Sequence, residues 1–486
     1  MKGNQKATSM GMLYYALGYF CIFSFGLFKI PVITNFFKPE QLGNYFLINS
    51  FLTYIDVLFL SWINGTIWRH VHDNRFPTYN SLVSSIIPIF GIAVILSLCT
   101  TILLSLLLNL WDIQIILIAF FTSLSGQVIS LYGSYLLYKT NVKHWSMLVC
   151  IQNICSFLLL VVLMLNETSI INIFLSVLIT NILILFFYIT PKHFRTRSFS
   201  IHFEKNTYKS LLSYSLILIV TNICITVLNN GDRFLIQHFK GEKSLGIYAQ
   251  NYSLATVGFF SFIQAFTTLF LPTFMKGIAA KAENGINSKI VRMYLLFFTP
   301  TFCFLLVNSF RITELLLGDE FRGYASIFNW VLAGTYCLGF ANFFETRLKF
   351  LNKIKLVSFS FFAIAIINLL INFILLKIYS INVSAIITFG SYFILLVLFL
   401  WFDRPYFQNL QIGSLILKLA VASSIYFFLS MLVKHFLPNN LLAFFSDAFI
   451  CFATYFIFLK RQFLEIGDVL HKALNSATNY NVTTTK

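Results

Sequence analysis

Long, uninterrupted runs of apolar residues dominate the chain, and short polar segments separate them. A run of about 18 or more apolar residues is typical of a transmembrane helix. A membrane β-barrel would instead alternate apolar and polar residues over segments of about 10 residues. The pattern therefore predicts an all-α integral membrane protein with about fourteen transmembrane helices.

The predicted spans follow one another so closely that no soluble domain is expected. They cover residues 11–34, 42–68, 81–108, 113–138, 145–165, 169–190, 210–236, 245–275, 290–309, 323–348, 355–376, 380–402, 413–433 and 440–460. The longest connection is the basic segment PKHFRTRSFSIHFEKNTYK at 191–209.

The placement of charge predicts the orientation. Only 10% of the residues are charged, whereas a soluble domain has about 25%, and the net charge is +17. Lysine and arginine are roughly three times as frequent in the loops on the side of the N-terminus as in the loops opposite. Because cytoplasmic loops carry this excess, both termini are expected in the cytoplasm. Basic residues confined to short loops also argue against nucleic acid as a partner.

A short polar phrase occurs twice. FFKPEQLGNY at 36–45 and HFKGEKSLGIY at 238–248 share Phe-Lys, a glutamate and Leu-Gly-x-Tyr. YKTNVK at 138–143 is likewise similar to FLNKIK at 350–355. Both pairs are six predicted spans apart and fall on matching sides of the membrane. This spacing indicates two pseudo-symmetric six-helix lobes, repeated in parallel about an axis along the membrane normal.

The repeat sets the predicted division of the chain, in which two extra C-terminal helices follow the two lobes. The predicted parts are an N-terminal lobe at 1–190, a basic cytoplasmic linker at 191–209, a C-terminal lobe at 210–402, two additional helices at 403–460 and a cytoplasmic tail at 461–486.

Each copy of the phrase is expected to turn the chain at the outer face of the membrane. Gly43 and Gly246 are predicted to allow a tight start to the next helix. Tyr45 and Tyr248 are predicted to lie at the depth of an interfacial aromatic belt. The phrase is therefore interpreted as structural and not as a binding motif.

Polar side chains recur at helical spacing in the first, second, fourth, seventh, eighth and tenth spans, whereas spans three, five, six, nine and eleven are more uniformly apolar. Polar groups at membrane depth are costly and usually face a partner or water, which predicts a hydrated cavity between the lobes. Accompanying serines and threonines have an alternative role, because they often bond their own backbone or a neighbouring helix. The candidate cavity residues are Lys29, Asn49, Asp56, Asn64, Gln127, Asn222, Asn229, Asp232, Arg233, Gln264, Asn342 and Glu345.

The charged candidates each allow two interpretations. Asp56 lies roughly 20 Å along its helix from the outer end, so it is suited to bind a cation or carry a proton, or to pair with a basic side chain. Arg233 and Lys29 lie at matching places in the two lobes and suit an anionic head group; alternatively, both extend toward the outer interface. Glu345 precedes Lys349 by four residues, which favours an intrahelical ion pair.

The chemistry of these positions favours transport over catalysis. The sequence has no Walker loop, no H-x-x-x-H metal pair and no G-x-S-x-G elbow. Its 8 cysteines are scattered in apolar runs and are interpreted as packing residues. A cationic, hydrogen-bonding cavity compensates an ionised head group for lost water, and amides suit sugar hydroxyls. We therefore expect a negatively charged, sugar-bearing lipid as substrate, with no enzyme activity and no cofactor.

Several of these features together resemble one family. The plan of two lobes and two extra helices, PEQLGNY after the first span and NNGDRFLIQHFKGEKSLGIYAQNYSLA around the seventh are similar to bacterial polysaccharide-exporter flippases. The resemblance implies a protein of the bacterial inner (plasma) membrane that moves undecaprenyl-pyrophosphate-linked oligosaccharides of O-antigen or lipopolysaccharide and capsule type between leaflets by alternating access. It also implies a cavity lined by helices one, two, four, seven, eight and ten.

Three alternatives stay open. The chain also fits a cation-coupled multidrug exporter or a lipid II flippase of the same superfamily. A third possibility is a membrane scaffold that docks glycosyltransferases through 191–209. Expected partners are a lipid-linked oligosaccharide, membrane lipids, and a polysaccharide polymerase with glycosyltransferases. Coupling to an H⁺ or Na⁺ gradient is the expected energy source.

Overall fold

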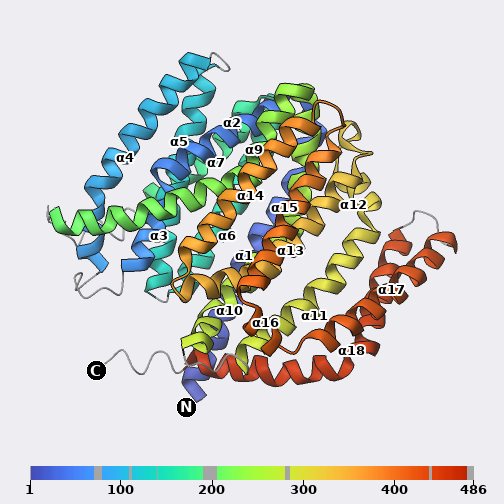
Figure 1. Cartoon of the computed structure of the whole chain (residues 1–486). Helices are drawn as coiled ribbons and strands as arrows, with labels where there is room; N and C mark the ends of the chain where they lie inside the picture. Colours follow the sequence, from blue (N-terminus) through green and yellow to red (C-terminus); the bar gives the residue numbers. More distant parts are fainter. Residues whose placement is uncertain are drawn as a thin grey trace. The chain divides into compact units, whose positions relative to one another are not determined.

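A computed structural model describes residues 2–70, 79–108, 112–139, 141–189, 205–279, 285–436 and 441–478. Throughout these ranges the regular structure is helical, and they contain no β-strand (Figure 1). The predicted all-α class is therefore confirmed. The predicted 191–209 linker falls largely outside the described residues.

The chain divides into two compact units that interleave along the sequence. Unit 1 contains Met1–Pro31, Gln250–Ser360 and Asn382–Lys486, and unit 2 contains Val32–Ala249 and Phe361–Ile381. Each unit combines segments from both predicted lobes. The predicted lobes describe the repeat in the sequence and stay a prediction. Three helices pass from one unit into the other: α1 (Lys2–Phe36), α9 (Lys205–Ala255) and α14 (Ile354–Leu375).

The remaining helices each lie in one unit. Those of unit 2 are α2 (Pro39–Phe59), α3 (Ser61–His70), α4 (Tyr79–Leu108), α5 (Ile113–Tyr138), α6 (Val142–Asn166), α7 (Ile170–Leu183) and the π-helix η1 (Ile184–Ile189). Those of unit 1 are the π-helix η2 (Thr256–Phe260), α10 (Ser261–Ala279), α11 (Ile286–Val307), α12 (Ser309–Leu316), the 3₁₀-helix η3 (Asp319–Phe321), α13 (Ala325–Phe350), α15 (Asn382–Phe402), α16 (Arg404–Asn409), α17 (Gly413–Phe436) and α18 (Leu441–Thr478).

Among the described residues, 13 helical stretches are long and apolar enough to cross a membrane. One of them, Leu218–Leu271, has 54 residues, which is about 80 Å of helix and more than twice the thickness of a bilayer core. Its backbone leaves the helical conformation at Gly241, where φ is 81° and ψ is 174°. The stretch therefore covers most of two predicted spans, 210–236 and 245–275, and agrees with about fourteen crossings.

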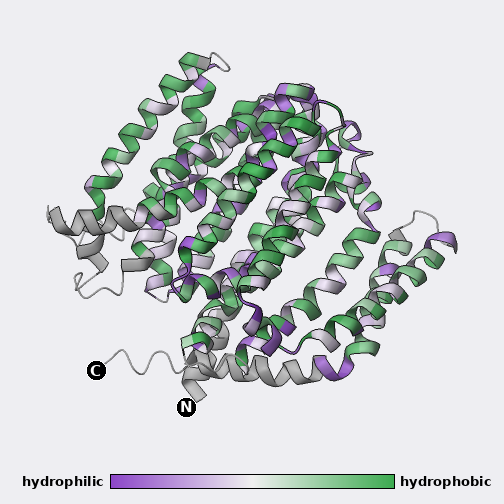
Figure 2. Ribbon diagram, viewed as in Figure 1, coloured by the Kyte–Doolittle hydropathy of each residue, from purple (hydrophilic) through white to green (hydrophobic). Residues whose placement is uncertain are grey.

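The outward-facing side chains are those of a membrane protein. Large apolar residues are exposed along α4 and α18, for example Leu107 at 70% and Phe449 at 74%. Figure 2 shows apolar residues along most of the length of the coloured helices, with polar residues near many helix ends. In water this exposure would be costly, whereas lipid chains solvate such surfaces. The chain is a multi-pass membrane protein.

Polar residues at the connections cap the helices. Asp112 accepts a hydrogen bond from the Gln114 backbone N–H at 3.0 Å, which starts α5. Asn141 and Ser169 cap α6 and α7 in the same way. These side chains satisfy backbone donors that lack helical partners, so very short connections suffice between neighbouring spans.

Unit 2 is built around α2, α4, α5, α6 and α7. Ile48, Phe51 and Ile55 of α2 pack against Phe120 of α5 and Phe174 of α7. Because lipid chains are as apolar as these residues, close van der Waals packing stabilises the contact more than exclusion from water does.

Unit 1 centres on α11, α13 and α15. Tyr294 of α11 stacks on Tyr336 and Phe340 of α13, with ring centroids 5.9 and 6.0 Å apart. Its hydroxyl group donates to the Tyr336 backbone oxygen at 2.8 Å, so the buried ring is also hydrogen-bonded. A Cβ at Gly339 would lie 2.5 Å from that hydroxyl oxygen, which leaves glycine as the residue that admits the ring.

The C-terminal helices are held to α11 and α13 by polar contacts. Arg347 of α13 forms an ion pair with Asp403 and lies over the Tyr406 ring of α16, 4.4 Å from its centroid. Ser288 of α11 donates to the Leu410 backbone oxygen at 3.0 Å. Between α11 and α18 an apolar cavity of about 400 Å³ remains.

Two elements differ in detail from the predicted pattern. The predicted second span, 42–68, agrees with the apolar stretch Pro39–Ile67, but within it α2 ends at Phe59 and α3 begins at Ser61. The predicted tail at 461–486 begins inside α18, which continues to Thr478. A polar sequence can extend a helix that is already nucleated, so the predicted division at residue 461 stays a prediction.

Candidate functional site

Asp56 of α2 lies in a polar cluster with two side chains of α5. Ser123 donates a short hydrogen bond to its carboxylate, and Gln127 also hydrogen-bonds that group. Both donors are neutral. The predicted polar stripes of the second and fourth spans therefore face each other, and they surround a carboxylate that is only partly exposed.

The same helix pair continues this polar contact beyond the break in the second span. Asn64 of α3 donates to Ser130 of α5 at 3.4 Å. Between the two contacts the helix is interrupted at Leu60, whose N–H still bonds the Asp56 backbone oxygen at 2.8 Å. Interrupted helices at membrane depth often accompany ligand or ion sites. Asn49, which precedes Asp56 by about two helical turns, is exposed.

A second cluster lies on α9 before its reversal. Asp232 is 1% exposed and accepts a short hydrogen bond from Tyr248, which is itself fully buried. The reversal at Gly241 carries Tyr248 back against α9, so its ring packs inside the protein. Its predicted depth at the membrane interface stays a prediction.

Arg233 points to a different neighbour from Asp232, as consecutive helical residues do. It is 8% exposed, donates to the Ser50 hydroxyl oxygen of α2 at 3.1 Å and lies 5.4 Å from the centroid of the Phe46 ring. Tyr54 of α2 packs on Phe234 nearby, with ring centroids 5.8 Å apart. The site thus combines a buried cation, a hydroxyl group and aromatic faces.

The other candidates fall in both units. Asn222 and Asn229 are half-buried on α9 in unit 2. In unit 1, Lys29 of α1, Gln264 of α10 and Asn342 of α13 are half-buried. The predicted matching of Lys29 with Arg233 joins residues of different units and stays a prediction.

Glu345 has a local partner. Its carboxylate lies 2.5 Å from the ammonium group of Lys349, four residues later on α13. The intrahelical pair that the spacing favoured is confirmed. In the eighth span, Thr267 bonds its own backbone, while Thr268 accepts from Tyr19 of α1 at 3.1 Å, so α1 packs on α10 through a hydroxyl pair.

Three hydrogen bonds of amide side chains were not predicted, and they involve spans described as more uniformly apolar. Gln152 of α6 donates to Asn181 of α7 at 2.9 Å, and Asn181 donates to Ser125 of α5 at 3.0 Å. On α14, Asn372 donates to the Asn368 side chain at 3.1 Å, and both residues are buried. Asn368 and Asn372 are four residues apart, so their helical spacing was a usable signal, whereas Gln152 and Asn181 lie on different helices and share no period. The cost of placing an amide at that depth is by itself a reason to expect a partner.

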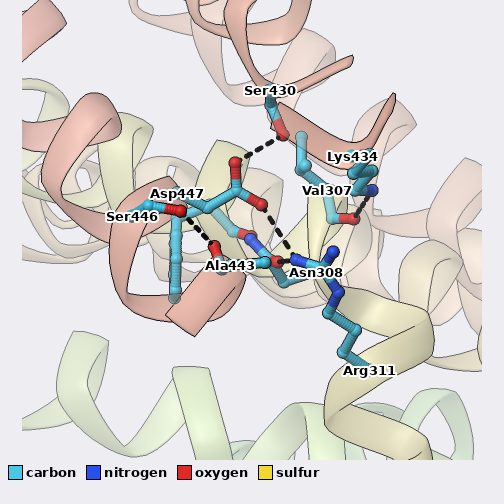
Figure 3. Close-up of polar contacts among 9 residues, drawn as sticks. Val307, Asn308, Arg311, Ser430, Lys434, Ala443, Ser446 and Asp447 are labelled. Atoms are coloured by element: carbon cyan, nitrogen blue, oxygen red, sulfur yellow. Dashed lines mark hydrogen bonds and ion pairs between the residues drawn. The ribbon is translucent and has the colours of Figure 1, made fainter. Parts of the chain in front are cut away.

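A buried ion pair in unit 1 was also missed. Arg311 of α12 lies 3.2 Å from Asp447 of α18, and Asp447 has no exposed side-chain surface. Ser430 of α17 donates to the same carboxylate at 3.0 Å (Figure 3). Lys434 nearby donates to the Val307 backbone oxygen at 2.6 Å. This arrangement fixes α17 and α18 to the end of α11.

The chain turns at each copy of the repeated phrase, as predicted, but Gly43 and Gly246 have a different role from the predicted one. Gly43 and Gly246 lie inside helices, where neither needs a positive φ, and the left-handed position is Gly241 instead. The two glycines are in close contact with the opposite copy of the phrase, so they permit helix packing and not a tight start to a helix.

Comparison with known proteins identifies the family of the chain. A family model described as "Polysaccharide biosynthesis protein" matches residues 9–278, more than half of the chain. The chain belongs to the polysaccharide biosynthesis protein family. A comparison of this polysaccharide biosynthesis protein with curated proteins found no match.

Solved structures share its fold. The lipid II flippase MurJ, in an inward closed conformation, matches with a TM-score of 0.65 and 17% identity over 93% of this chain and 99% of that one. The MATE transporter VcmN of Vibrio cholerae matches with a TM-score of 0.55 and 14% identity over 84% and 99%. This polysaccharide biosynthesis protein therefore has the fold of membrane flippases and transporters, as the sequence resemblance implied.

Proposed function

We propose that this polysaccharide biosynthesis protein is a flippase and not an enzyme. Its proposed substrate is an undecaprenyl-pyrophosphate-linked oligosaccharide repeat unit of O-antigen or capsule type. It moves that lipid from the inner to the outer leaflet of a bacterial plasma membrane by alternating access, with both termini in the cytoplasm. The family, the membrane fold and the polar residues at membrane depth support the proposal.

The observation that carries it is the burial of Arg233 within a membrane-spanning helix. An arginine residue that is 8% exposed at this depth is expensive, and such residues usually mark a transport path. Arg233 is held by Ser50 and the Phe46 ring, both on α2. A guanidinium matches phosphate oxygens with two parallel hydrogen bonds, so a pyrophosphate head group is the complementary ligand.

Amide side chains suit the sugar part of the same substrate. Asn222 and Asn229 share α9 with Arg233, while Asn49 lies on α2 and Asn64 on α3. Each amide offers donors and an acceptor that can replace water around sugar hydroxyls. In unit 1, Gln264 and Asn342 provide further amide groups, and Lys29 provides a cation.

Asp56 is the proposed residue for coupling to an H⁺ or Na⁺ gradient. The two side chains described above as hydrogen-bond partners of its carboxylate, Ser123 and Gln127, are both neutral donors. An ionised carboxylate in such surroundings is costly, and binding a cation or a proton removes that cost. Cation binding would then alternate with substrate movement.

The test is flipping by purified protein in vesicles that contain a fluorescent lipid-linked oligosaccharide. Parent protein should move the lipid to the opposite leaflet. Arg233→Gln should lower the initial rate about tenfold or more, and Arg233→Lys should retain part of it, because Lys keeps the charge and loses the bidentate geometry. Arg322→Gln is the control, since Arg322 is exposed outside the spans.

The same assay separates the alternatives. Transport of lipid II in preference to an oligosaccharide lipid would assign the cell-wall substrate. Transport of an organic cation alone would assign a multidrug exporter. No transport by folded protein of any of the three would favour a scaffold for a polymerase and glycosyltransferases, and would contradict the proposal.

A further inference from the structure

The two copies of the repeated phrase cross each other within unit 2, with glycine at the contact. A Cβ atom at Gly43 would lie 2.1 Å from the backbone oxygen of Glu242, and one at Gly246 would lie 1.9 Å from that of Pro39. Cβ atoms essentially never come within 3.0 Å of such atoms. The start of α2 and the part of α9 after Gly241 therefore touch through their backbones.

The contact is reciprocal. Pro39 precedes Gly43 by four residues, and Glu242 precedes Gly246 by four residues. Each glycine therefore faces the carbonyl group that lies about one helical turn before the other glycine. Two copies of one phrase that meet about a twofold axis produce this relationship. The crossing thus joins equivalent points of the two predicted lobes.

The side chains around the crossing add only weak contacts. Asn44 donates to the Glu242 carboxylate at 3.1 Å. Lys243 and Glu40 form an ion pair at 3.8 Å, with side chains 61% and 45% exposed. Exposed pairs at this distance are screened by water and salt. The crossing is therefore held mainly by short-range packing, which is lost as soon as the segments separate.

Non-helical residues stand directly before both crossing segments. Lys38, before Pro39, is extended with φ −74° and ψ 155°. Gly241, before Glu242, has φ 81° and ψ 174°, a conformation that glycine adopts without strain. Residues at the ends of helices that absorb changes in φ and ψ are the usual hinges of gating movements.

We propose that this glycine crossing is the outer gate of the flippase and that the gate is closed in this structure. To release substrate on the outer side, the Pro39–Gly43 segment moves away from the Glu242–Gly246 segment, with rotation at Lys38 and Gly241. The inference rests on the alternating access proposed above and on the outer location predicted from charge. The absence of side chains at the two glycines is what allows complete closure.

A pair of cysteines at Glu40 and Lys243 tests the gate directly, because these side chains meet across the crossing. The Glu40→Cys, Lys243→Cys protein is joined in vesicles by a short or a long flexible thiol-reactive linker. The short linker should reduce flipping of the oligosaccharide lipid more than tenfold, and the long linker should leave it within about twofold of the unlinked protein. Each single variant treated alike is the control.

Two results of this experiment would overturn the proposed gate. Normal flipping with the short linker would overturn the proposal, because the crossing would then not need to open. Equal inhibition by both linkers would also overturn it, because the loss would follow from modification and not from restraint.

Substitution of the glycines tests closure without any linker. Gly43→Ala or Gly246→Ala should hold the gate open, so a membrane-impermeant thiol reagent added outside should label Asn49→Cys several-fold faster than in the parent. Gly390→Ala is the matched control, because a Cβ at Gly390 meets no atom within 4 Å. Unchanged labelling in folded Gly43→Ala and Gly246→Ala proteins would contradict closure at this contact.

Failure of the gate and failure of the proposed function give different results. If the parent protein flips no oligosaccharide lipid, the function fails, while labelling of Asn49→Cys still reports whether the crossing opens. If the parent flips the lipid and the short linker has no effect, the function stands and the gate fails.

Discussion

The Tyr248 hydroxyl group donates a hydrogen bond to the Asp232 carboxylate, although sixteen residues separate them. In one continuous helix these residues would lie about 24 Å apart. The bond therefore requires the chain to reverse at Gly241, where the backbone is not helical. A buried carboxylate on the seventh span and a tyrosine at the start of the eighth thus fix the angle between two spans.

Removing this donor should destabilise the protein. Tyr248→Phe keeps the ring and leaves Asp232 with one hydrogen bond fewer at 1% exposure. The expected loss is about 1–3 kcal/mol of unfolding free energy, seen as a lower Tm in detergent. Adding Asp232→Asn to Tyr248→Phe should restore part of the loss, because the neutral amide costs less to bury. A Tm equal to that of the parent would show that the bond contributes nothing.

The Arg311–Asp447 pair should behave as a buried ion pair. Asp447→Asn or Arg311→Gln alone leaves one charge buried near Ser430 and is expected to cost about 3–5 kcal/mol. The double variant should be more stable than the sum of the single losses implies, which thermal unfolding in a double-mutant cycle measures.

The matched control is the exposed pair of Arg322 and Asp319, whose side chains are 42% and 89% accessible. The same substitutions there should change stability by about 0–1 kcal/mol. Additive losses at Arg311 and Asp447 would mean that the two charges do not interact.

Asp56→Asn should uncouple transport from the ion gradient without unfolding the protein. An asparagine carbonyl oxygen still accepts the hydrogen bond of Ser123 but binds no proton and holds a cation weakly. We expect downhill exchange of the lipid to persist while accumulation driven by a pH or Na⁺ gradient falls about tenfold or more, a change of ~1.4 kcal/mol or more. Gradient-driven flipping at the parent rate would remove Asp56 from the coupling.

The predicted orientation is open to a direct measurement. Arg322 and Lys353 are both exposed, in loops on opposite predicted sides. In intact cells a membrane-impermeant maleimide should label Arg322→Cys and should label Lys353→Cys only after the membrane is permeabilised, because the basic loops are predicted to face the cytoplasm. The reverse pattern would invert the topology and move the proposed gate to the cytoplasmic side.

The spans were predictable because each apolar run carries its own signal. The Glu345–Lys349 pair was predictable for a similar reason, since four residues on one helix fix the distance between the side chains. The contact between Asp56 and Ser123 could be predicted only indirectly. Both residues lie on polar helix faces, and polar faces within a membrane usually face other helices or a cavity and not lipid.

Other contacts depend on tertiary geometry that spacing does not contain. Asp447 stands alone in LLAFFSDAFICF, and its partner Arg311 is 136 residues away, so no period linked them. Tyr248 was placed by its distance from a loop, yet the reversal at Gly241 buries it. The repeat in the sequence showed that Gly43 and Gly246 correspond, but not that the two copies touch.

The glycine crossing also has a consequence for the evolution of the chain. When a duplication places two similar motifs in contact, a substitution in one motif changes its fit against the other. Neither glycine can therefore be replaced without affecting the contact between both motifs. Relatives that close in the same manner should keep a residue without a side chain at both positions, however far the rest has diverged. Paired retention or paired loss across homologues would then identify this closed arrangement from aligned sequences alone.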